Sequence, residues 1–290
     1  MYQDRNPEAI DPRHAGLPDQ DRLKPQTSTI LMSWQTLKTI NRHERDQHIH
    51  FDEPTHTYTV KGTYKGYVSV TKLIHNFFPE FDATAVIQKM RASPKFALGE
   101  YADMTDKQIL AKWRSGTALG TQLHLAIEQY LNGAADQIDT AILLRPEWNF
   151  FMRFWDKYQD QIAPYRLEWE VWVEELKLAG SIDGVFRRKS DGAFLLYDWK
   201  RSKDIKLENP FQSGFGPLSH LPDTNYWHYT IQLNIYRWIL ENYYGIKIAE
   251  MYLVILHPNF KSFRRIAVNR LEEEIEEIME LRRKGLEEGV

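Results

Sequence analysis

Three neighbouring segments between Arg166 and Lys200 alternate apolar and polar residues, and they constrain the fold more than any other feature. The segments read LEWEVWV, LAGSIDGVFRR and AFLLYDWKR, with short breaks between them. Alternation over such lengths is typical of strands with one buried face, and Asp191-Gly192 is a turn signal. The sequence therefore predicts a meander of three antiparallel strands.

Helical patterns lie on both sides of this meander. We expect helices from about Thr105 to Leu131 and from Glu147 to Gln159 before it, and from about Tyr229 to Tyr243 after it. Two further strands, EMYLVIL and SFRRIAV, and a charged helix from Leu271 complete the chain. Strands interspersed with helices favour an α/β fold with a central mixed β-sheet flanked by helices.

The N-terminal third has a different pattern. Residues 1–28 are rich in Asp, Pro, Gln and Arg and lack periodic apolar positions, which predicts a flexible tail. A short helix is expected from about Ser33 to Arg45, and the segments HIHFD, HTYTVKG and GYVSVTKLI indicate a small antiparallel unit. We therefore predict an N-terminal accessory segment over 29–104 and a main domain over 105–290.

The chain contains no cysteine, which excludes disulfides, thiol catalysis, cysteine-ligated zinc and iron–sulfur clusters held by cysteine. Any metal ion must be held by oxygen and imidazole ligands. The sequence has neither an apolar run long enough to cross a membrane nor a secretory signal, so we expect a soluble, intracellular protein. A net charge of -3 provides no overall attraction to nucleic acid.

The DWK segment places Asp198 and Lys200 on one face of a strand and Trp199 on the other. If the preceding hairpin loop is residues 189–192, Asp183 falls directly opposite Asp198. Neighbouring carboxylates repel unless a cation lies between them, and Mg²⁺ takes carboxylates, waters and phosphate oxygens as ligands. The arrangement indicates metal-dependent hydrolysis of a phosphodiester, with Lys200 neutralising charge on the attacked phosphate.

Other polar residues have spacings that suit the same site. On the preceding strand, Glu170 shares its face with Glu168 and is the better-placed third carboxylate, because it lies in the middle of the strand. His124 lies beside an apolar stripe of its helix. Gln232 and Tyr236 are four residues apart on another helix, where they can hydrogen-bond substrate phosphates or orient the lysine.

Each residue also has an ordinary interpretation when it is taken alone. Asp183 in GSIDG suits a turn, His124 suits a hydrogen-bonded core position, and Glu170 suits a solvated strand face. Gln232 and Tyr236 suit a helix surface. The occurrence of all these signals in order, with suitable spacing, favours a site.

The set GTQLHLAIE, the Glu170 strand, GSIDG, DWK and QLNIY resembles the PD-(D/E)XK nuclease superfamily, in particular its RecB-like exonuclease branch. The resemblance covers roughly residues 113–256 and implies a restriction-endonuclease-like core. This resemblance implies that the metal ligands are His124, Asp183, Asp198 and the backbone carbonyl of Trp199. It implies that the catalytic residues are Asp183, Asp198, Lys200 and Glu170. It also implies that Gln232 and Tyr236 contact the substrate.

The same resemblance implies a deoxyribonuclease that depends on Mg²⁺ or Mn²⁺ and acts in DNA replication, repair or recombination. It implies an exonuclease that prefers single-stranded ends, similar to viral and mitochondrial genome-maintenance exonucleases. The absence of cysteine disfavours the branch members that carry an iron–sulfur cluster. Two alternatives remain open: a non-catalytic nucleic-acid-binding module on the same fold, and a nuclease directed to RNA.

A polar stretch rich in Gly and Pro, from Leu207 to Asn225, is long enough to suggest a functional loop. Phe215 and Trp227, in and beside it, are candidates for stacking on unpaired bases, and Arg201 is a candidate phosphate contact. Solvated charges and aromatic rings that pin the loop to the core are the ordinary alternative. The predicted partner is DNA, single-stranded or with free ends.

Overall fold

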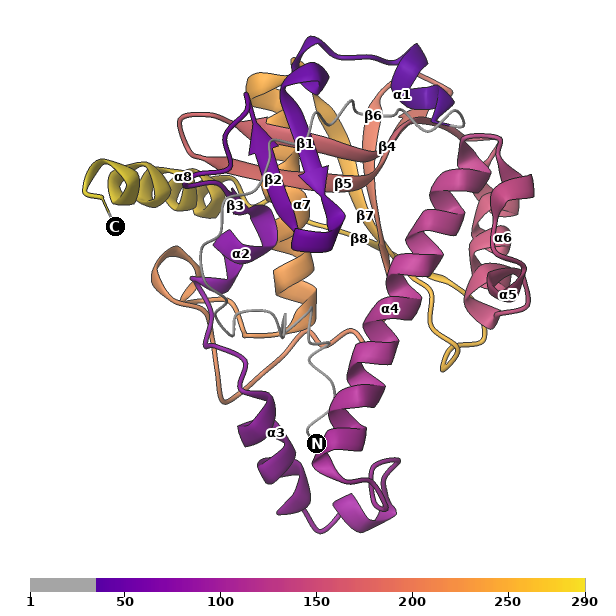
Figure 1. Cartoon of the computed structure of the whole chain (residues 1–290), viewed down its shortest axis with the longest axis vertical. Coiled ribbons are helices and arrows are strands. Elements are labelled where there is room, and N and C mark those ends of the chain that lie inside the picture. The colour runs from indigo at the N-terminus through magenta and orange to yellow at the C-terminus, as the bar shows by residue number, and fades with distance from the viewer. Residues whose placement is uncertain (1–34, 290) are drawn as a thin grey trace, which may run out of the picture.

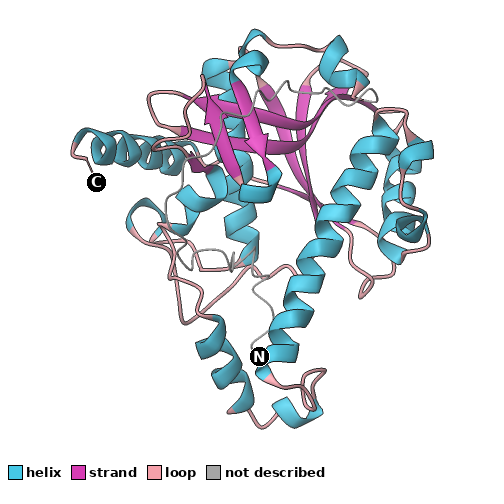
Figure 2. Ribbon diagram, viewed as in Figure 1, coloured by secondary structure: helices cyan, strands magenta, loops and turns pink. Residues whose placement is uncertain are grey.

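The computed structural model of the chain describes residues 35–289. Its centre is a six-stranded sheet with both parallel and antiparallel pairs, and helices flank this sheet (Figures 1 and 2). The predicted α/β class with a central mixed sheet is therefore confirmed. The predicted flexible tail over 1–28 lies outside the described residues. Among the described residues, no helix combines the length and apolar character that crossing a membrane requires.

The central strands are β3 (Val68–Ser69), β4 (Ile162–Val173), β5 (Leu178–Arg188), β6 (Phe194–Lys200), β7 (Ile248–Ile255) and β8 (Arg264–Ala267). They run in the order β3, β5, β6, β7, β8, and β4 pairs with the other edge of β5. The pairs β4–β5 and β5–β6 are antiparallel, which confirms the meander. The β6–β7 pair is parallel, and β8 closes the far edge by pairing antiparallel with β7.

The four helices that the sequence predicted after residue 104 are present, with bounds within four residues of those expected. Thr105 caps the longest of the described helices, because its side chain accepts a hydrogen bond from the backbone N–H of Gln108 and the Gln108 side chain accepts one from the backbone N–H of Thr105. The described helices are α1 (Thr36–Ile40), α2 (Val70–His75), α3 (Ala83–Arg91), α4 (Asp106–Leu131), α5 (Thr140–Leu143), α6 (Pro146–Tyr158), α7 (Asn225–Tyr243) and α8 (Glu272–Glu287).

Different helices cover the two faces of the sheet. Apolar side chains of α2, α7 and α8 form one core with the sheet, and those of α4 and α6 form a second core on the opposite face. Trp199 belongs to the second core, where its ring lies 5.4 Å from the ring of Phe154 of α6, between centroids. Lys200, the next residue, reaches α7. The predicted division of the DWK strand into a packing face and a chemical face is thus present.

The N-terminal segment departs from its prediction in one respect. Strands β1 (Ile49–Asp52) and β2 (Thr57–Val60) pair antiparallel as expected. The third predicted strand of that unit is wrong: only β3 is extended, it pairs parallel with β5 in the central sheet, and the chain then turns into α2. Ser69 causes this turn, because its hydroxyl caps α2 by accepting from the backbone of Lys72 at 3.1 Å.

The expected helix over residues 33–45 is also interrupted. Its described part consists of α1 and a 3-10 helix over Glu44–His48, which His43 caps. Asp46 anchors this turn to the sheet, because its Oδ2 lies 2.7 Å from Nη1 of the buried Arg166 on β4. Parts of the predicted accessory segment therefore pack against the main sheet, whereas the division at residue 105 stays a prediction.

In the hairpin between β5 and β6, the Arg188 N–H donates to the Ala193 carbonyl at 2.8 Å, so the turn is the four residues 189–192 that the sequence predicted. Its ladder ends at the pair of Gly184 with Tyr197, so Asp183 and Asp198 are each one residue beyond the last pair. Beyond this point β5 and β6 separate, and β3 takes the vacated edge of β5. The two aspartates therefore lie where the paired strands part.

Candidate metal centre

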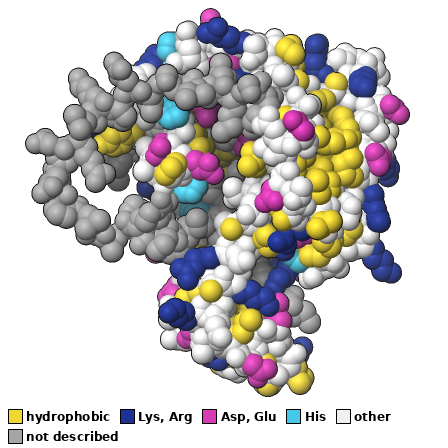
Figure 3. All heavy atoms as spheres, turned by 45° about the vertical axis from the view of Figure 1, so that its right-hand side comes forward, with side chains coloured by type: hydrophobic (Ala, Val, Ile, Leu, Met, Phe, Trp, Pro, Cys, Tyr) yellow, Lys and Arg dark blue, Asp and Glu magenta, His cyan; other side chains and the backbone are white. Residues whose placement is uncertain are grey.

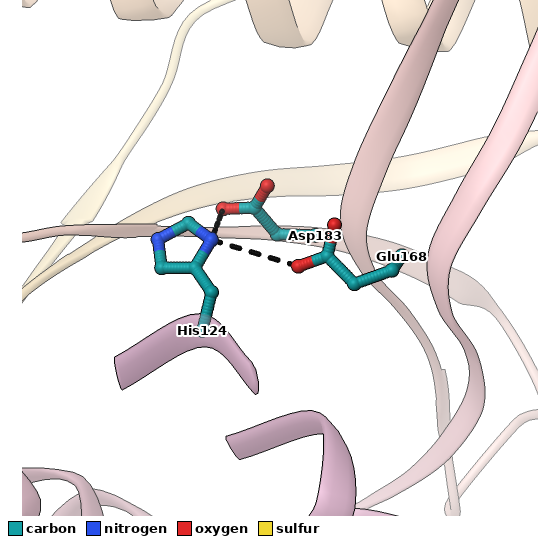
Figure 4. A group of neighbouring side chains, drawn as sticks. All are labelled: His124, Glu168 and Asp183. Atoms are coloured by element: carbon teal, nitrogen blue, oxygen red, sulfur yellow. Dashed lines mark ion pairs between the residues drawn. The ribbon is translucent and has the colours of Figure 1, made fainter. Parts of the chain in front are cut away.

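Three side chains from three elements converge at this point: His124 from α4, Glu168 from β4 and Asp183 from β5 (Figure 4). One potential ligand atom of each lies within 4.8 Å of the others. His124 Nδ1 is 3.5 Å from Glu168 Oε1 and 3.6 Å from Asp183 Oδ2. Carboxylate oxygens suit Mg²⁺ and Mn²⁺, and an imidazole nitrogen suits transition metals. The group could therefore hold a divalent metal ion.

The imidazole is oriented by a backbone contact. His124 Nε2 lies 2.8 Å from the carbonyl oxygen of Trp199, which leaves Nδ1 directed at the two carboxylates. Metal-binding histidines usually donate their other ring N–H to such an acceptor. In this structure the Trp199 carbonyl, which the resemblance assigned to the metal, thus orients His124. Its assignment as a ligand stays a prediction.

Glu168 reaches the group through an unusual backbone conformation. Its φ is 41°, in the left-handed region that side chains other than glycine rarely adopt, although it lies within a strand. The β4–β5 register places it across from Asp183. Ser181 of the GSIDG segment donates a hydrogen bond to Glu168 Oε2 at 3.1 Å. Strained residues held by such contacts are common at functional sites.

The carboxylate in this group is Glu168, where the sequence analysis favoured Glu170. Glu170 pairs with Ser181, two positions farther along β4, and the side chains that influence its ionisation include Lys38 and His50 of the N-terminal segment. Burial raises the pKa of Glu170. Alternation put both glutamates on one face, but only the register against β5 shows which of them is level with Asp183. A catalytic role for Glu170 stays a prediction.

Asp198 and Lys200 form a second part of the site, next to the group of three. Asp198 is buried, and its Oδ2 lies 3.1 Å from Lys200 Nζ. The same ammonium donates to Gln232 Oε1 of α7 at 3.2 Å and lies 4.7 Å from the ring centroid of Tyr229. The predicted relation between Lys200 and Gln232 is therefore present in the structure, and α7 holds the lysine in place.

The electrostatics favour a bound cation. Burial raises the pKa of Asp198 to about 7; Lys200 opposes the rise and Asp183 adds to it. Burial also raises the pKa of Asp183. For His124, burial opposes the charged ring, but Asp183 and Glu168 outweigh it and raise the pKa to about 9. A positive ion bound beside these carboxyl groups would oppose the rises in their pKa, because it stabilises their charged forms.

Tyr236 is buried beside the site, and Gly180 makes room for it. A Cβ at Gly180 would lie 2.7 Å from Tyr236 Cε1 and 2.8 Å from its hydroxyl oxygen. Burial raises the pKa of Tyr236, and the charges of Asp183 and Asp198 add to this. The first glycine of GSIDG therefore lets a phenol of α7 approach the sheet near the two aspartates.

Three predicted substrate contacts lie outside these two parts of the site. Arg201 Nε donates to Oε1 of the buried Glu147 on α6 at 2.8 Å. Trp227 is half-buried, and its Nε1 donates to the Leu207 carbonyl at 3.3 Å, so the ring fastens the loop before α7. Phe215 is 52% exposed and can accept a stacked base.

Comparison with known proteins does not identify a function for this chain, so the functional assignment rests on the site residues described above. No family profile and no curated protein matches the chain. Among solved structures, SSO0001 is 16% identical with a TM-score of 0.35, over 76% of each chain. A "putative exonuclease" from Eubacterium rectale is 14% identical with a TM-score of 0.38, over 77% of this chain and 79% of that one. Likenesses this low carry no weight for function.

Proposed function

We propose that this protein is a metal-dependent nuclease that hydrolyses phosphodiester bonds of DNA. The observation that carries the proposal is the placement of His124, Glu168 and Asp183 beside the Asp198–Lys200 pair. A site for binding alone has no need of an ammonium held next to a cluster of carboxylates, whereas phosphoryl transfer needs both a cation and a positive charge near the phosphate.

The donor set fits a divalent cation, because one nitrogen and two carboxylate oxygens lie close enough to share it. A divalent cation bound there would polarise a phosphoryl oxygen and lower the pKa of a bound water. Lys200, held by Gln232 and Asp198, would stabilise negative charge that develops on the phosphate. His124, oriented by the Trp199 carbonyl, would keep Nδ1 directed at the cation position.

We further propose that the substrate is DNA with a free, single-stranded end, cleaved exonucleolytically in replication, repair or recombination. Two exposed aromatic rings on the loop before α7 support single-strand binding: Phe211 is 79% exposed and Phe215 is 52% exposed. Aromatic rings stack on unpaired bases without regard to sequence, and each stack contributes roughly 1–3 kcal/mol.

The decisive experiment incubates the full chain with end-labelled single-stranded, duplex and circular DNA and with matched RNA. Chelator should abolish cleavage, Mg²⁺ or Mn²⁺ should restore it, and Ca²⁺ should support binding with little turnover. Circular DNA should resist an exonuclease. Asp183→Asn is the inactive control, because it removes a charge from the group of three.

Each contrary outcome has a defined meaning. Full activity in excess chelator would refute the metal mechanism. Cleavage of RNA but not DNA would replace the proposal with an RNA-directed nuclease. Tight binding without cleavage under every metal condition would identify a nucleic-acid-binding module that keeps the fold without the chemistry.

A further inference from the structure

A second charged cluster lies on the arm that α3 and the first half of α4 form away from the sheet (Figure 1). The Glu100 carboxylate lies between two ammonium groups. Its Oε2 is 2.8 Å from Lys112 Nζ of α4, and its Oε1 accepts a hydrogen bond from Lys203 Nζ. Both ammonium groups also lie over the ring of Tyr101, 5.0 Å and 5.4 Å from its centroid. Two cations from separate segments therefore meet at one anion.

Two chain segments connect this cluster to the candidate metal centre. Lys203 follows Lys200 by three residues, so their Cα atoms are at most about 11 Å apart. Lys112 lies on α4, the helix that also carries His124. A strand of nucleic acid whose scissile phosphate lies at Lys200 would therefore have a neighbouring part of its backbone within reach of Lys203.

The loop that presents Lys203 is held firmly. The side chain of Asn225, the first residue of α7, donates to Ser202 Oγ at 3.1 Å and to the Asp204 carbonyl at 2.7 Å. It also accepts from the backbone of Lys206 at 3.0 Å. Lys203 is thus attached to a pinned turn between β6 and α7, so its ammonium is positioned before a ligand arrives.

The cluster is accessible and has an excess of positive charge. The side chains of Lys203, Lys112 and Glu100 are 28%, 38% and 44% exposed. Figure 3 shows Lys and Arg side chains interspersed with acidic ones on the lower arm. Hydrogen bonds from the two lysines outweigh burial and lower the pKa of Glu100 to about 2, so the carboxylate is ionised at working pH. Ion pairs this exposed are weak, so another anion can displace the carboxylate from the two lysines.

We propose that Lys112 and Lys203 bind a backbone phosphate of the nucleic-acid strand next to the scissile one, and that Glu100 occupies this phosphate position in the free protein. The inference rests on the proposed function. In this proposal the Glu100 carboxylate competes with the phosphate for Lys112 and Lys203, and binding of the strand displaces the carboxylate from the two lysines.

The test measures the affinity of the full chain for a fluorescent oligothymidylate in Ca²⁺, over a series of salt concentrations. Glu100→Gln should bind more tightly, by about fivefold at low salt, because a charge that repels phosphate is lost. Lys112→Gln and Lys203→Gln should each bind more weakly and lower the slope of log K against log salt by about 0.7. Glu174→Gln is the matched control, since Glu174 forms an exposed ion pair with Lys61 elsewhere on the surface.

The change in DNA affinity of Glu100→Gln distinguishes competition with phosphate, which predicts tighter binding, from a purely structural role of Glu100. If Glu100 only fastens the arm, Glu100→Gln should weaken binding or leave it unchanged, and either result would overturn the inference while the parent still binds. If the parent itself does not bind single-stranded DNA, the proposed single-stranded substrate is wrong and this subsite fails with it, whereas cleavage of duplex DNA would still support the nuclease.

Discussion

The carboxylate of Asp183 caps the backbone of Trp199, whose N–H donates to Asp183 Oδ2 at 2.9 Å. The contact lies where β5 and β6 stop pairing, so a side chain replaces a hydrogen bond of the strand ladder. The same oxygen lies 3.6 Å from His124 Nδ1. One carboxylate therefore both supports the parted strands and contributes to the candidate metal centre.

This double role predicts different effects for two substitutions of Asp183. Asp183→Asn keeps an acceptor for the Trp199 N–H and removes the charge, so metal affinity should fall while the fold stays stable. Asp183→Ala also leaves the N–H without its partner, and it should be less stable than Asp183→Asn by about 1–3 kcal/mol. Calorimetric metal titration and denaturant unfolding of both variants check this. Equal stability would show that the cap is unimportant.

Asp198 and Lys200 should separate metal binding from turnover. Asp198→Asn removes a charge beside the cation position, so both metal affinity and cleavage should fall. Lys200→Ala leaves the carboxylates intact, so metal should still bind, while turnover should fall by about 10²–10³-fold. Lys200→Arg should not restore full activity, because a guanidinium is larger and planar. Single-turnover cleavage beside calorimetry measures both effects; parental cleavage by Lys200→Ala would remove Lys200 from the mechanism.

The two glutamates of β4, Glu168 and Glu170, allow a matched comparison of their contributions to metal binding. Glu168→Gln removes a charge from the group of three and should weaken Mn²⁺ binding by an order of magnitude or more, since close opposite charges are lost. Glu170→Gln, two residues away on the same strand, should change metal affinity much less. Mn²⁺ titration of both variants decides between them. A larger loss for Glu170→Gln would restore the assignment that the sequence favoured.

Gly180→Ala should disturb the site through packing alone. The added methyl would meet Tyr236 at 2.7 Å and Val70 Cγ2 at 3.0 Å, so the variant should lose about 1–3 kcal/mol of stability and displace the phenol. Gly120→Ala is the control: its Cβ meets no atom within 4 Å, and alanine in a helix should stabilise by up to about 1 kcal/mol. Thermal unfolding compares the two; a Gly180→Ala variant as stable as the parent would contradict the close approach.

The raised pKa of Glu128 predicts that the stability of the folded protein depends on pH. Burial and the charge of Glu168 raise its pKa to about 7, and it is 8% exposed. Because its pKa is higher in the folded state, the folded protein binds the Glu128 proton more tightly than the unfolded chain does. The stabilisation from this proton is fully present below the unfolded pKa of 4.5 and is lost as pH rises through about 7.

Glu128→Gln removes this titration and keeps an oxygen to accept the hydrogen bond from Gln35. In chelator it should therefore be more stable than the parent at pH 8, by roughly 2–3 kcal/mol, with the difference vanishing near pH 4.5. Denaturant unfolding across that range is the measurement. A difference that stays constant with pH would mean that Glu128 ionises normally.

Local patterns determined much of this protein. Alternation of apolar residues predicted the three strands of the meander, although β4 begins at Ile162, before the alternating segment, and helical periodicity predicted α4, α6 and α7 to within a few residues. The four-residue hairpin loop was enough to set the register of the ladder, which ends at Gly184 and Tyr197, one residue before Asp183 and Asp198. The absence of cysteine excluded whole classes of metal site.

Only the tertiary structure decided which distant residues meet. It brought Glu168 rather than Glu170 level with Asp183, through a backbone conformation that no alternation rule anticipates. It placed β3 in the central sheet, and it paired Arg201 with Glu147 of α6. The physical reason is that periodicity and turn length act between neighbours in the chain, whereas the register of separate strands and the partner of a long side chain depend on how whole elements pack.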